Sequence, residues 1–566
     1  MESSKEVDYD LVLSYVGQFG WFQKKILFFL SLVSSAGGLA VVVFAFTGFE
    51  PSYRCRVPEC ESGPTISYYA DNKNFVLPSW YKGNKVEREN RCRNMQVNKE
   101  EGFCTAENSS FTWVQPGEEN ATCLVDDLVF DQTLMSSTVV EEFGLVCDQA
   151  RLRTGVNITY MLGLLVGAYM FGWISDKFGR IKALILGILC VSVGGFGGAF
   201  CTGTTGLYVF SILRFLCGIG GIACFMVSFV LIVEHVGSKY SMIVGIGINI
   251  PFAIGEIILG VEAYFIRDWK TLQMVAYGPM LALLVVYWIS PESVRWLLAR
   301  GKFMEAKRIV KMIANQNGAE FPEQVFKKLE GKAIEERGNE KIKQGPKSTS
   351  VRNILKSSEM CFRVLNMSFQ WFSVTLCFYG LSFASTSLSR NVFTNFQLSV
   401  AIEIPAYIFC LLVIDRWGRK PVLSLCQLVS GVACISCAFL QGSQDPSLLL
   451  LQTCLSLVGK FGASAAFAIV YLYTAEMFPT CIRNQSVGFC AFTAKIGGVT
   501  TMLLELLKEY WLPAPVLIMG VCASIAGGLA LLFPETAGEK LPDTMEEAVM
   551  MGSNKKKGLC SCTSGS

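Results

Sequence analysis

Long apolar blocks separated by short polar segments make up most of this chain. Each block contains about 20 residues, which is the length that an α-helix needs to cross the hydrocarbon core of a bilayer. The first block spans 26–47, and five more lie at 155–175, 181–201, 207–234, 241–266 and 271–290. The last six lie at 363–385, 393–414, 421–441, 447–473, 484–508 and 514–533. The pattern predicts an all-α membrane protein with twelve transmembrane helices in two halves of six.

The polar segments set the expected domain boundaries and the orientation. The loop at 291–362 carries fifteen Lys and Arg, and positive charge favours the cytoplasmic side of a membrane. An even number of spans then places both termini in the cytoplasm. The expected domains are a lead at 1–25, helix one at 26–47, an insert at 48–153, helices two to six at 154–290, a cytoplasmic loop with short helices at 291–362, helices seven to twelve at 363–533 and a tail at 534–566.

The insert after the first block holds six cysteines and two N-glycosylation sequons, at Asn108 and Asn120. An even number of cysteines beside sequons is typical of an extracellular segment that is stapled by disulfides. The cysteines are Cys55, Cys60, Cys92, Cys104, Cys123 and Cys147. Their spacing fits no standard zinc site, and it does not choose among the pairings that six cysteines allow.

Three features recur at nearly the same spacing, which indicates an internal duplication. The charged turn that begins at Asp176 recurs 239 residues later at Asp415. A Pro-Glu-Ser triplet at 291–293 recurs as Pro-Glu-Thr 243 residues later, and Glu234 recurs 242 residues later as Glu476. Two similar halves of apolar spans are typical of transporters whose halves rock around a central binding site.

Composition agrees with this interpretation and argues against other classes. The chain is 52% hydrophobic and 17% charged, whereas soluble domains contain about 25% charged residues. A net charge of +3 without a broad basic face gives no support for nucleic-acid binding. The single His argues against histidine-based metal sites and catalytic triads, and no phosphate-binding loop occurs. We therefore expect no enzyme, no metal and no cofactor, and secondary transport in which coupling to Na⁺ is left open.

Seven ionisable residues fall inside the apolar blocks, where charge is costly and usually functional. Glu403 is suited to hold a substrate ammonium or a coupling cation, but an ion pair with Lys460 or Lys495 explains it equally well. Lys495 lies beside glycines that let a neighbouring helix approach closely, and it is suited to hold a substrate carboxylate. The seven residues are Arg214, Glu256, Glu262, Glu403, Lys460, Lys495 and Glu505.

Aromatic residues recur near these charges, and aromatic faces attract quaternary or protonated amines. Packing inside the bundle or contact with lipid is the alternative for each of them. The aromatic residues are Phe225, Phe252, Trp371, Phe378, Tyr379, Phe467 and Tyr471. Together with Glu256, Glu403 and Lys495 they make up the predicted substrate site.

The two charged turns resemble the Asp-[Arg/Lys]-x-Gly-Arg loop of the major facilitator superfamily. Within it, the six-cysteine insert and the stretches at 20–24, 263–269, 403–407 and 474–480 resemble the solute carrier 22 family of organic ion transporters, and the resemblance covers almost the whole chain. Sugar porters share the Pro-Glu-Ser-x-Arg-Trp stretch at 291–296 but lack the insert. The resemblance implies the major facilitator fold and a plasma-membrane transporter of small organic ions, surrounded by lipid and acting as a monomer.

The resemblance also implies roles for single residues. Organic cation transporters of the family carry a glutamate in span eight, matched by Glu403, and aromatic residues in spans four, five and seven. They place an aspartate in span eleven, where this chain has Lys495, and the anion and carnitine transporters have a basic residue there. We expect a carnitine-like zwitterion or an organic cation. The alternatives are an organic anion exchanger of the same family and, from another class, a non-transporting receptor or scaffold.

In this family, ion pairs at the cytoplasmic side act as latches that hold the outward-open state, and breaking them permits inward opening. The residues that the resemblance assigns to these latches are Asp176, Arg180, Glu234, Arg295, Asp415, Arg419, Glu476 and Arg483. We call them the latch residues.

Overall fold

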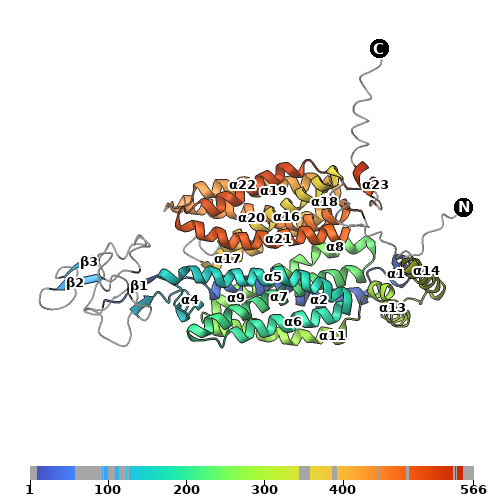
Figure 1. Ribbon diagram of the computed structural model, residues 1–566, viewed down its shortest axis with the longest axis horizontal. Helices are drawn as coiled ribbons and strands as arrows, with labels where there is room; N and C mark the ends of the chain where they lie inside the picture. Colours follow the sequence, from blue (N-terminus) through green and yellow to red (C-terminus); the bar gives the residue numbers. More distant parts are fainter. Residues whose placement is uncertain are drawn as a thin grey trace, which may run out of the picture.

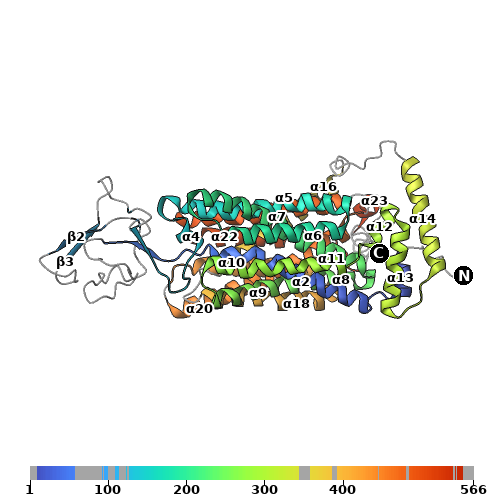
Figure 2. The same cartoon turned by 90° about the horizontal axis from the view of Figure 1, so that it is seen from below.

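The computed structural model describes residues 9–57, 92, 95–99, 109–113, 123, 127–342, 357–384, 392–443, 445–479, 483–538, 542 and 545–551. Its long helices form two bundles that lie side by side, one from each half of the chain (Figure 1). The strands of the insert extend from one end of the bundles, and α1 (Tyr9–Val16), α13 (Phe303–Asn317) and α14 (Glu323–Ile342) cover the other (Figure 2). We call these the insert end and the loop end.

The first bundle is built by the chain from the N-terminal side of the long basic loop. It contains α2 (Trp21–Thr47), α5 (Ala150–Phe178), α6 (Arg180–Gly198), α7 (Gly203–His235), α8 (Ser238–Gly247) with α9 (Asn249–Phe265), and α10 (Trp269–Tyr277) with η4 (Gly278–Val285) and α11 (Val286–Ile289). The short α12 (Val294–Arg300) follows at the loop end.

The second bundle repeats this arrangement. It contains α16 (Ser358–Ala384), α17 (Val392–Ala401) with α18 (Glu403–Trp417), α19 (Arg419–Phe439), α20 (Pro446–Met477), α21 (Arg483–Glu505) with η6 (Leu506–Glu509), and α22 (Ala514–Ala530). A short helix, α23 (Met545–Met550), follows it.

In the described part of the chain, ten helices are long and apolar enough to cross a membrane. Two further helices complete the pattern but do not meet both criteria. The helix α22 is apolar and has 17 residues, and α16 has 27 residues but buries polar side chains such as Asn366, Gln370 and Thr375 along its length. The prediction of an all-helical architecture in two halves agrees with the structure, whereas the count of twelve spans stays a prediction.

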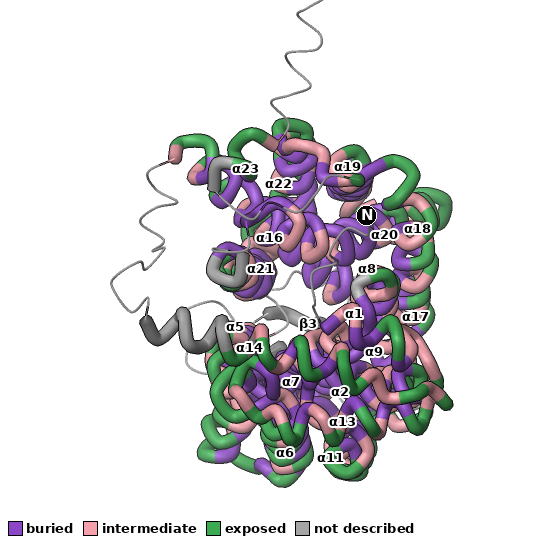
Figure 3. Tube along the Cα trace, turned by 90° about the vertical axis from the view of Figure 1, so that its right-hand side faces the viewer, coloured by how far each residue is buried: buried purple, intermediate pink, exposed green. Residues whose placement is uncertain are grey.

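Exposed positions lie on the outside of both bundles and buried positions gather inside them (Figure 3), and many of the exposed positions carry large apolar side chains. A soluble protein rarely exposes so much apolar surface, and a bilayer is the solvent that matches it. Examples of these exposed side chains are Tyr169, Ile212, Trp288, Leu412, Val432 and Phe439.

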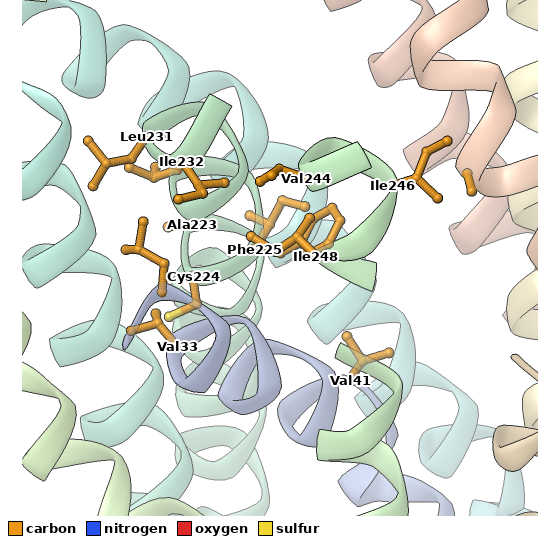
Figure 4. Close-up of a cluster of buried hydrophobic side chains, with 14 of the residues drawn as sticks. Val33, Val41, Ala223, Cys224, Phe225, Leu231, Ile232, Val244, Ile246 and Ile248 are labelled. Carbon is orange, nitrogen blue, oxygen red and sulfur yellow. The ribbon is translucent and has the colours of Figure 1, made fainter. Parts of the chain in front are cut away.

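Small residues allow the helices of the first bundle to approach closely. A Cβ atom at Gly255 of α9 would collide with the backbone carbonyl of Ser35 on α2, and one at Gly38 of α2 would collide with the carbonyl of Phe252 on α9. Such close backbone approach is how membrane helices gain packing without a hydrophobic driving force between them. Part of the surrounding apolar core, which includes Val33, Cys224 and Val244, is seen in Figure 4.

Two of the spans are broken near the middle of the protein. The helices α8 and α9 meet at Ile248, and α17 and α18 meet at Ile402. Each break lies three residues before a proline, Pro251 in one span and Pro405 in the other. A proline breaks a helix in the turn before it, because its ring clashes with the carbonyl four residues earlier and it has no N–H to donate to that carbonyl. These breaks place the start of α9 and of α18, including Glu403, between the two bundles.

In the insert, β1 (Tyr53–Cys55) pairs antiparallel with β4 (Leu128–Phe130), and β2 (Met95–Lys99) pairs antiparallel with β3 (Ser109–Trp113). The short α4 (Val139–Glu142) and η3 (Cys147–Gln149) lead into α5. Disulfides join Cys55 to Cys123 and Cys92 to Cys147, pairings that the sequence left open. The remaining predicted disulfide and glycosylation residues, Cys60, Cys104, Asn108 and Asn120, lie outside the described residues.

Replacing Gly255 with alanine should lower the thermal stability of the protein. The added methyl group would meet the backbone of α2, so the two helices must move apart at a cost of about 1–3 kcal/mol. The melting temperature of the detergent-purified protein measures the change, with size-exclusion chromatography after heating to detect the folded fraction. The control is Gly155→Ala in α5, because no atom lies within 4 Å of the Cβ position there. Equal melting temperatures for the two variants would contradict the close approach of α2 and α9.

Candidate functional site

A small cavity of about 20 Å³ lies between the two bundles. This volume is enough for about one water molecule. Residues from both halves of the chain form its wall. The internal duplication predicted a central site between the halves, and this cavity lies in that place. The lining residues are Val41, Leu164, Gly221, Ile222, Phe225, Asn249, Phe252, Phe378, Tyr379, Tyr407, Phe467, Tyr471 and Lys495.

Seven of the ten residues of the predicted substrate site therefore lie around one cavity. Six of them are aromatic and interlock in pairs. Phe225 and Phe252 of the first bundle meet edge to face at 5.2 Å between ring centroids, and Phe378 and Phe467 of the second stack at 5.0 Å. Aromatic faces from both halves thus enclose the cavity, an arrangement that suits the binding of an ammonium group.

Trp371 does not line the cavity. Its ring packs against Tyr471 with centroids 4.2 Å apart, and its Nε1 donates a hydrogen bond of 2.8 Å to Thr474 Oγ1. Trp371 is thereby held behind the aromatic wall, where it fixes the position of Tyr471.

Glu403 forms a fully buried ion pair with Lys460, whose Nζ lies 2.8 Å from Glu403 Oε1. The hydroxyl of Tyr407 donates a hydrogen bond of 2.9 Å to the other carboxylate oxygen. Lys460 also donates to Ser382 Oγ at 2.6 Å and to the carbonyl of Phe378 at 3.2 Å. Of the two lysines that the sequence offered as partners of Glu403, the structure selects Lys460.

Lys495 is 6% exposed and lines the cavity. No side chain or carbonyl of the described residues hydrogen-bonds to its ammonium or forms an ion pair with it. An ammonium held away from water without a counter-charge is costly, so Lys495 leaves the wall of the cavity with an uncompensated positive charge.

Glu256 presents the opposite imbalance. Its side chain is fully buried on α9, and neither carboxylate oxygen has a hydrogen-bond donor among the described residues. It lies one helical turn after Phe252, so the two side chains share a face of α9. Its helix α9 packs against α18, the helix that carries Glu403.

Sequence reasoning missed two polar residues of the wall, Tyr407 and Asn249. A usable signal existed for Tyr407, because it follows Glu403 by four residues and so lies on the same helix face. Asn249 follows the break at Ile248, and its amide donates to the carbonyl of Ile246 at 3.0 Å. The helix break determines where Asn249 lies, and no sequence pattern of its own marks it as a residue of the cavity wall.

The two bundles touch on both sides of the cavity. Towards the insert end, Gln397 donates a hydrogen bond of 3.0 Å to the carbonyl of Ile257, and Phe46 stacks on Phe393 at 5.6 Å. Towards the loop end, the rings of Phe229 and Tyr471 lie 6.0 Å apart. A separate vestibule of about 1360 Å³ opens at the insert end between the same bundles. The structure is therefore a closed conformation around the cavity.

At the loop end, Arg180 binds two acidic latch residues. Its guanidinium lies 2.8 Å from Asp176 Oδ1 and 3.0 Å from Glu234 Oε1. Glu292 accepts a hydrogen bond of 2.8 Å from the backbone N–H of Arg180. Burial raises the pKa of Glu292, and the N–H groups of Ser293, Arg180 and Ile181 act in the opposite direction. The turn itself requires Gly179, whose φ is +110°.

The second half repeats this cluster. Arg419 lies 3.0 Å from Glu476 and 3.3 Å from Asp415, its backbone N–H donates to Glu535 at 2.9 Å, and Gly418 has a φ of +90°. The three features that suggested the duplication thus meet in space in each half. The contacts of the first cluster named above lie within its own bundle, whereas in the second cluster the Arg419 guanidinium also lies 3.8 Å from Met242 Sδ on α8 of the first bundle.

Of the remaining latch residues, Arg295 has a different partner. Arg295 pairs with Asp10 of α1 at 2.8 Å and lies over the ring of Tyr9. The side chain of Arg483 lies outside the described residues.

Comparison with known proteins identifies the family. The family described as Sugar (and other) transporter matches residues 102–547. The chain is 31% identical to human solute carrier family 22 member 2 over 97% of this chain and 96% of that protein. It is 30% identical to the organic cation transporter protein of Drosophila melanogaster over 96% of this chain and 95% of that protein.

The fold has a solved counterpart in the proton:xylose symporter XylE bound to 6-bromo-6-deoxy-D-glucose. The TM-score is 0.60 at 16% identity, and the match covers 95% of this chain and 99% of that chain. This likeness shows the major facilitator fold alone. Together with the relatives, it makes the chain a multi-pass membrane transporter and not an enzyme. The chain belongs to the solute carrier 22 family of the major facilitator superfamily.

Proposed function

We propose that this protein is a plasma-membrane secondary transporter for small carnitine-like zwitterions, which carry a quaternary or protonated amine and a carboxylate. The observation that carries the proposal is the ammonium of Lys495, which has no partner among the described residues, on a side chain only 6% exposed in the wall of a largely aromatic cavity. A substrate carboxylate would supply the counter-charge that the protein itself does not provide. A simple organic cation would meet an uncompensated positive charge there.

The amine end of the substrate has a matching environment. Phe252 and Tyr407 line the cavity. Each lies one helical turn from a glutamate, Phe252 from Glu256 on α9 and Tyr407 from Glu403 on α18. Aromatic faces attract a quaternary ammonium without hydrogen bonds, and the carboxylates add attraction over a longer distance. Glu256, Glu403, Lys460 and Lys495 sum to zero charge when all four are ionised, so a net-neutral ligand leaves the balance of the site unchanged.

Transport would proceed by alternating access. A cavity of about 20 Å³ is far smaller than any such substrate, so substrate binding requires the bundles to separate. We infer that the loop end faces the cytoplasm, with both termini there, because the basic loop lies at that end. The latch clusters would then stabilise one conformation by about 1–3 kcal/mol, which is enough to shift populations strongly.

A second function, exchange of organic anions, also has one observation in its favour. Lys495 without a partner would attract a carboxylate whether or not the ligand carries an amine. Glu256 and Glu403 disfavour this alternative, because a purely anionic ligand adds a third negative charge to the site.

Replacing Lys495 with aspartate should separate these substrates. Carnitine uptake should fall at least about tenfold because a charge-assisted hydrogen bond to the carboxylate is lost. Uptake of tetraethylammonium should stay the same or rise, because the repulsion between this cation and Lys495 is replaced by attraction to the new carboxylate. Labelled uptake in cells, normalised to surface protein, measures both.

The control for this charge reversal is Lys508→Asp, since Lys508 lies in the vestibule and pairs with Glu505. Uptake of para-aminohippurate by the wild type, without uptake of carnitine or tetraethylammonium, would establish the anion exchanger and reject the zwitterion. Unchanged carnitine uptake by the Lys495 variant would remove Lys495 from the site.

Substitutions in the latch clusters should reduce turnover more than substrate affinity. Glu234 is 17% exposed in its ion pair with Arg180, whereas Asp176 is 76% exposed, and an exposed pair contributes little. Glu234→Gln should therefore reduce the maximal rate several-fold with little change in KM, and Asp176→Asn should do so less. Initial rates over a range of substrate concentrations measure both constants. Lys182→Gln, at an exposed position nearby, is the control; an equal loss in all three variants would deny the clusters a specific role.

A further inference from the structure

Arg214 carries a buried positive charge inside the first bundle, away from the wall of the central cavity. It lies about three turns into α7 from the insert end, and its side chain is 1% exposed. None of its three guanidinium nitrogens has a hydrogen-bond partner among the described residues. A guanidinium stays protonated in proteins, so Arg214 cannot lose its charge as a buried lysine or carboxyl group can. A counter-charge would therefore lower the cost of burying it.

The groups closest to the guanidinium are neutral. Its carbon lies 4.5 Å from the ring centroid of Tyr160 on α5 and 5.0 Å from that of Phe44 on α2. The faces of these rings attract a cation, but they carry no net charge and offer no lone pairs to its five N–H groups. Tyr277 of α10 also lies near Arg214, and its neutral hydroxyl accepts a hydrogen bond of 3.4 Å from Cys217 Sγ.

Two side chains of α10 add buried donors that lack acceptors in the described part of the chain. They are the amide of Gln273 and Nε1 of Trp269, and both side chains are fully buried. Gln273 Nε2 and the ring of Phe210 lie 3.1 Å and 3.2 Å from the Cβ position of Gly198, and the ring centroids of Phe210 and Trp269 are 5.9 Å apart. Phe210 precedes Arg214 by one turn of α7, so these unsatisfied donors gather around the same part of that helix.

The helices around Arg214 contain no acid that could balance it. The helices α2, α6 and α10 have no Asp or Glu. The helices α5 and α7 have one each, Asp176 and Glu234, and both pair with Arg180 at the loop end.

Acids elsewhere in the first bundle do not reach Arg214 either. At the insert end they already have partners of their own, which are Arg153 for Glu50, Lys270 for Glu142, and Ser137 and Thr271 for Asp268. The remaining two, Glu256 and Glu262, lie on α9, which packs against α17 and α18 of the second bundle as well as against α2. Neither forms an ion pair with a described residue. The charge of Arg214 is thus left without an anion from the described protein.

We propose that the first bundle binds a small monovalent anion, with the chemistry of chloride, at the guanidinium of Arg214, and that Gln273 and Trp269 donate further hydrogen bonds to it. One negative charge matches the one positive charge, whereas a divalent anion would leave an excess of negative charge in a medium of low dielectric constant. A small ion suits a place enclosed by buried side chains. The anion would join α7 to α10 and so stabilise the first bundle.

The structure also offers a path for the anion. Phe44, whose ring faces the guanidinium, lines the vestibule of about 1360 Å³ at the insert end. A change in the rotamer of this one side chain would bring Arg214 towards the water of the vestibule. Arg151, an exposed residue that also lines the vestibule, adds positive potential that attracts anions.

The test measures the binding of chloride to the full-length protein in detergent, without substrate, so its result does not depend on the proposed transport function. Chloride replaces gluconate at constant ionic strength. At about 100 times the Kd, chloride should raise the melting temperature of the wild type by about 2–5 °C, and radioactive chloride should bind at a single site. Arg214→Gln should abolish both effects. The matched control, Lys495→Gln, removes the charge of the buried lysine in the central cavity and should keep both.

The outcomes decide whether Arg214 is the anion site. A wild type that neither binds radioactive chloride nor gains stability from it would overturn the proposal. Binding that is lost in Lys495→Gln but kept in Arg214→Gln would assign the anion to the central cavity and overturn it as well. If Arg214→Gln does not fold, Arg214→Lys takes its place, because it keeps the charge but loses the planar set of donors. Its affinity for chloride should fall at least about tenfold, and an unchanged affinity would reject the site.

Discussion

The cost of holding charge in a medium of low dielectric constant governs the centre of this protein. Four ionisable side chains lie buried between the bundles, and only the pair of Glu403 and Lys460 is complete. Within the described residues, Glu256 has no hydrogen-bond donor and Lys495, in the cavity wall, forms no ion pair. Elsewhere the protein compensates its charged groups with its own side chains, since Arg180 and Arg419 each pair with a glutamate. Leaving these two groups incomplete transfers part of the electrostatic balance to whatever the cavity binds.

The architecture around this centre follows from the duplication. Each half contributes a charged turn, a glycine in the left-handed region and a glutamate that receives backbone N–H groups. These clusters lie in the loop end and hold each bundle together as a unit. The ion pairs of these clusters lie within each bundle, whereas the contacts between bundles are aromatic pairs and single hydrogen bonds, such as that from Gln397 to the carbonyl of Ile257. The interface between bundles is therefore the place where the molecule can open.

The sequence predicted the two-bundle helical fold and most of the aromatic wall, because apolar block length and repeated motifs carry that information directly. It did not decide which lysine pairs with Glu403, because the rotation of α20 relative to α21 cannot be inferred from one sequence. It also left Trp371 inside the predicted site, whereas packing places that ring behind Tyr471. Disulfide pairing was open for a related reason, since spacing alone does not bring Cys55 to Cys123.

The small volume of the cavity connects the closed conformation of the bundles with the choice of ligand. The cavity accommodates about one water molecule, so the aromatic rings that would contact a substrate are in contact with each other in its absence. Phe378 illustrates this, since it stacks on Phe467 and also lies 3.5 Å from Lys460 Nζ. A substrate must replace these ring contacts with its own, and only a ligand with complementary charge also relieves the imbalance at Lys495. Under the proposed transport function, discrimination between substrates would therefore depend on charge more than on shape.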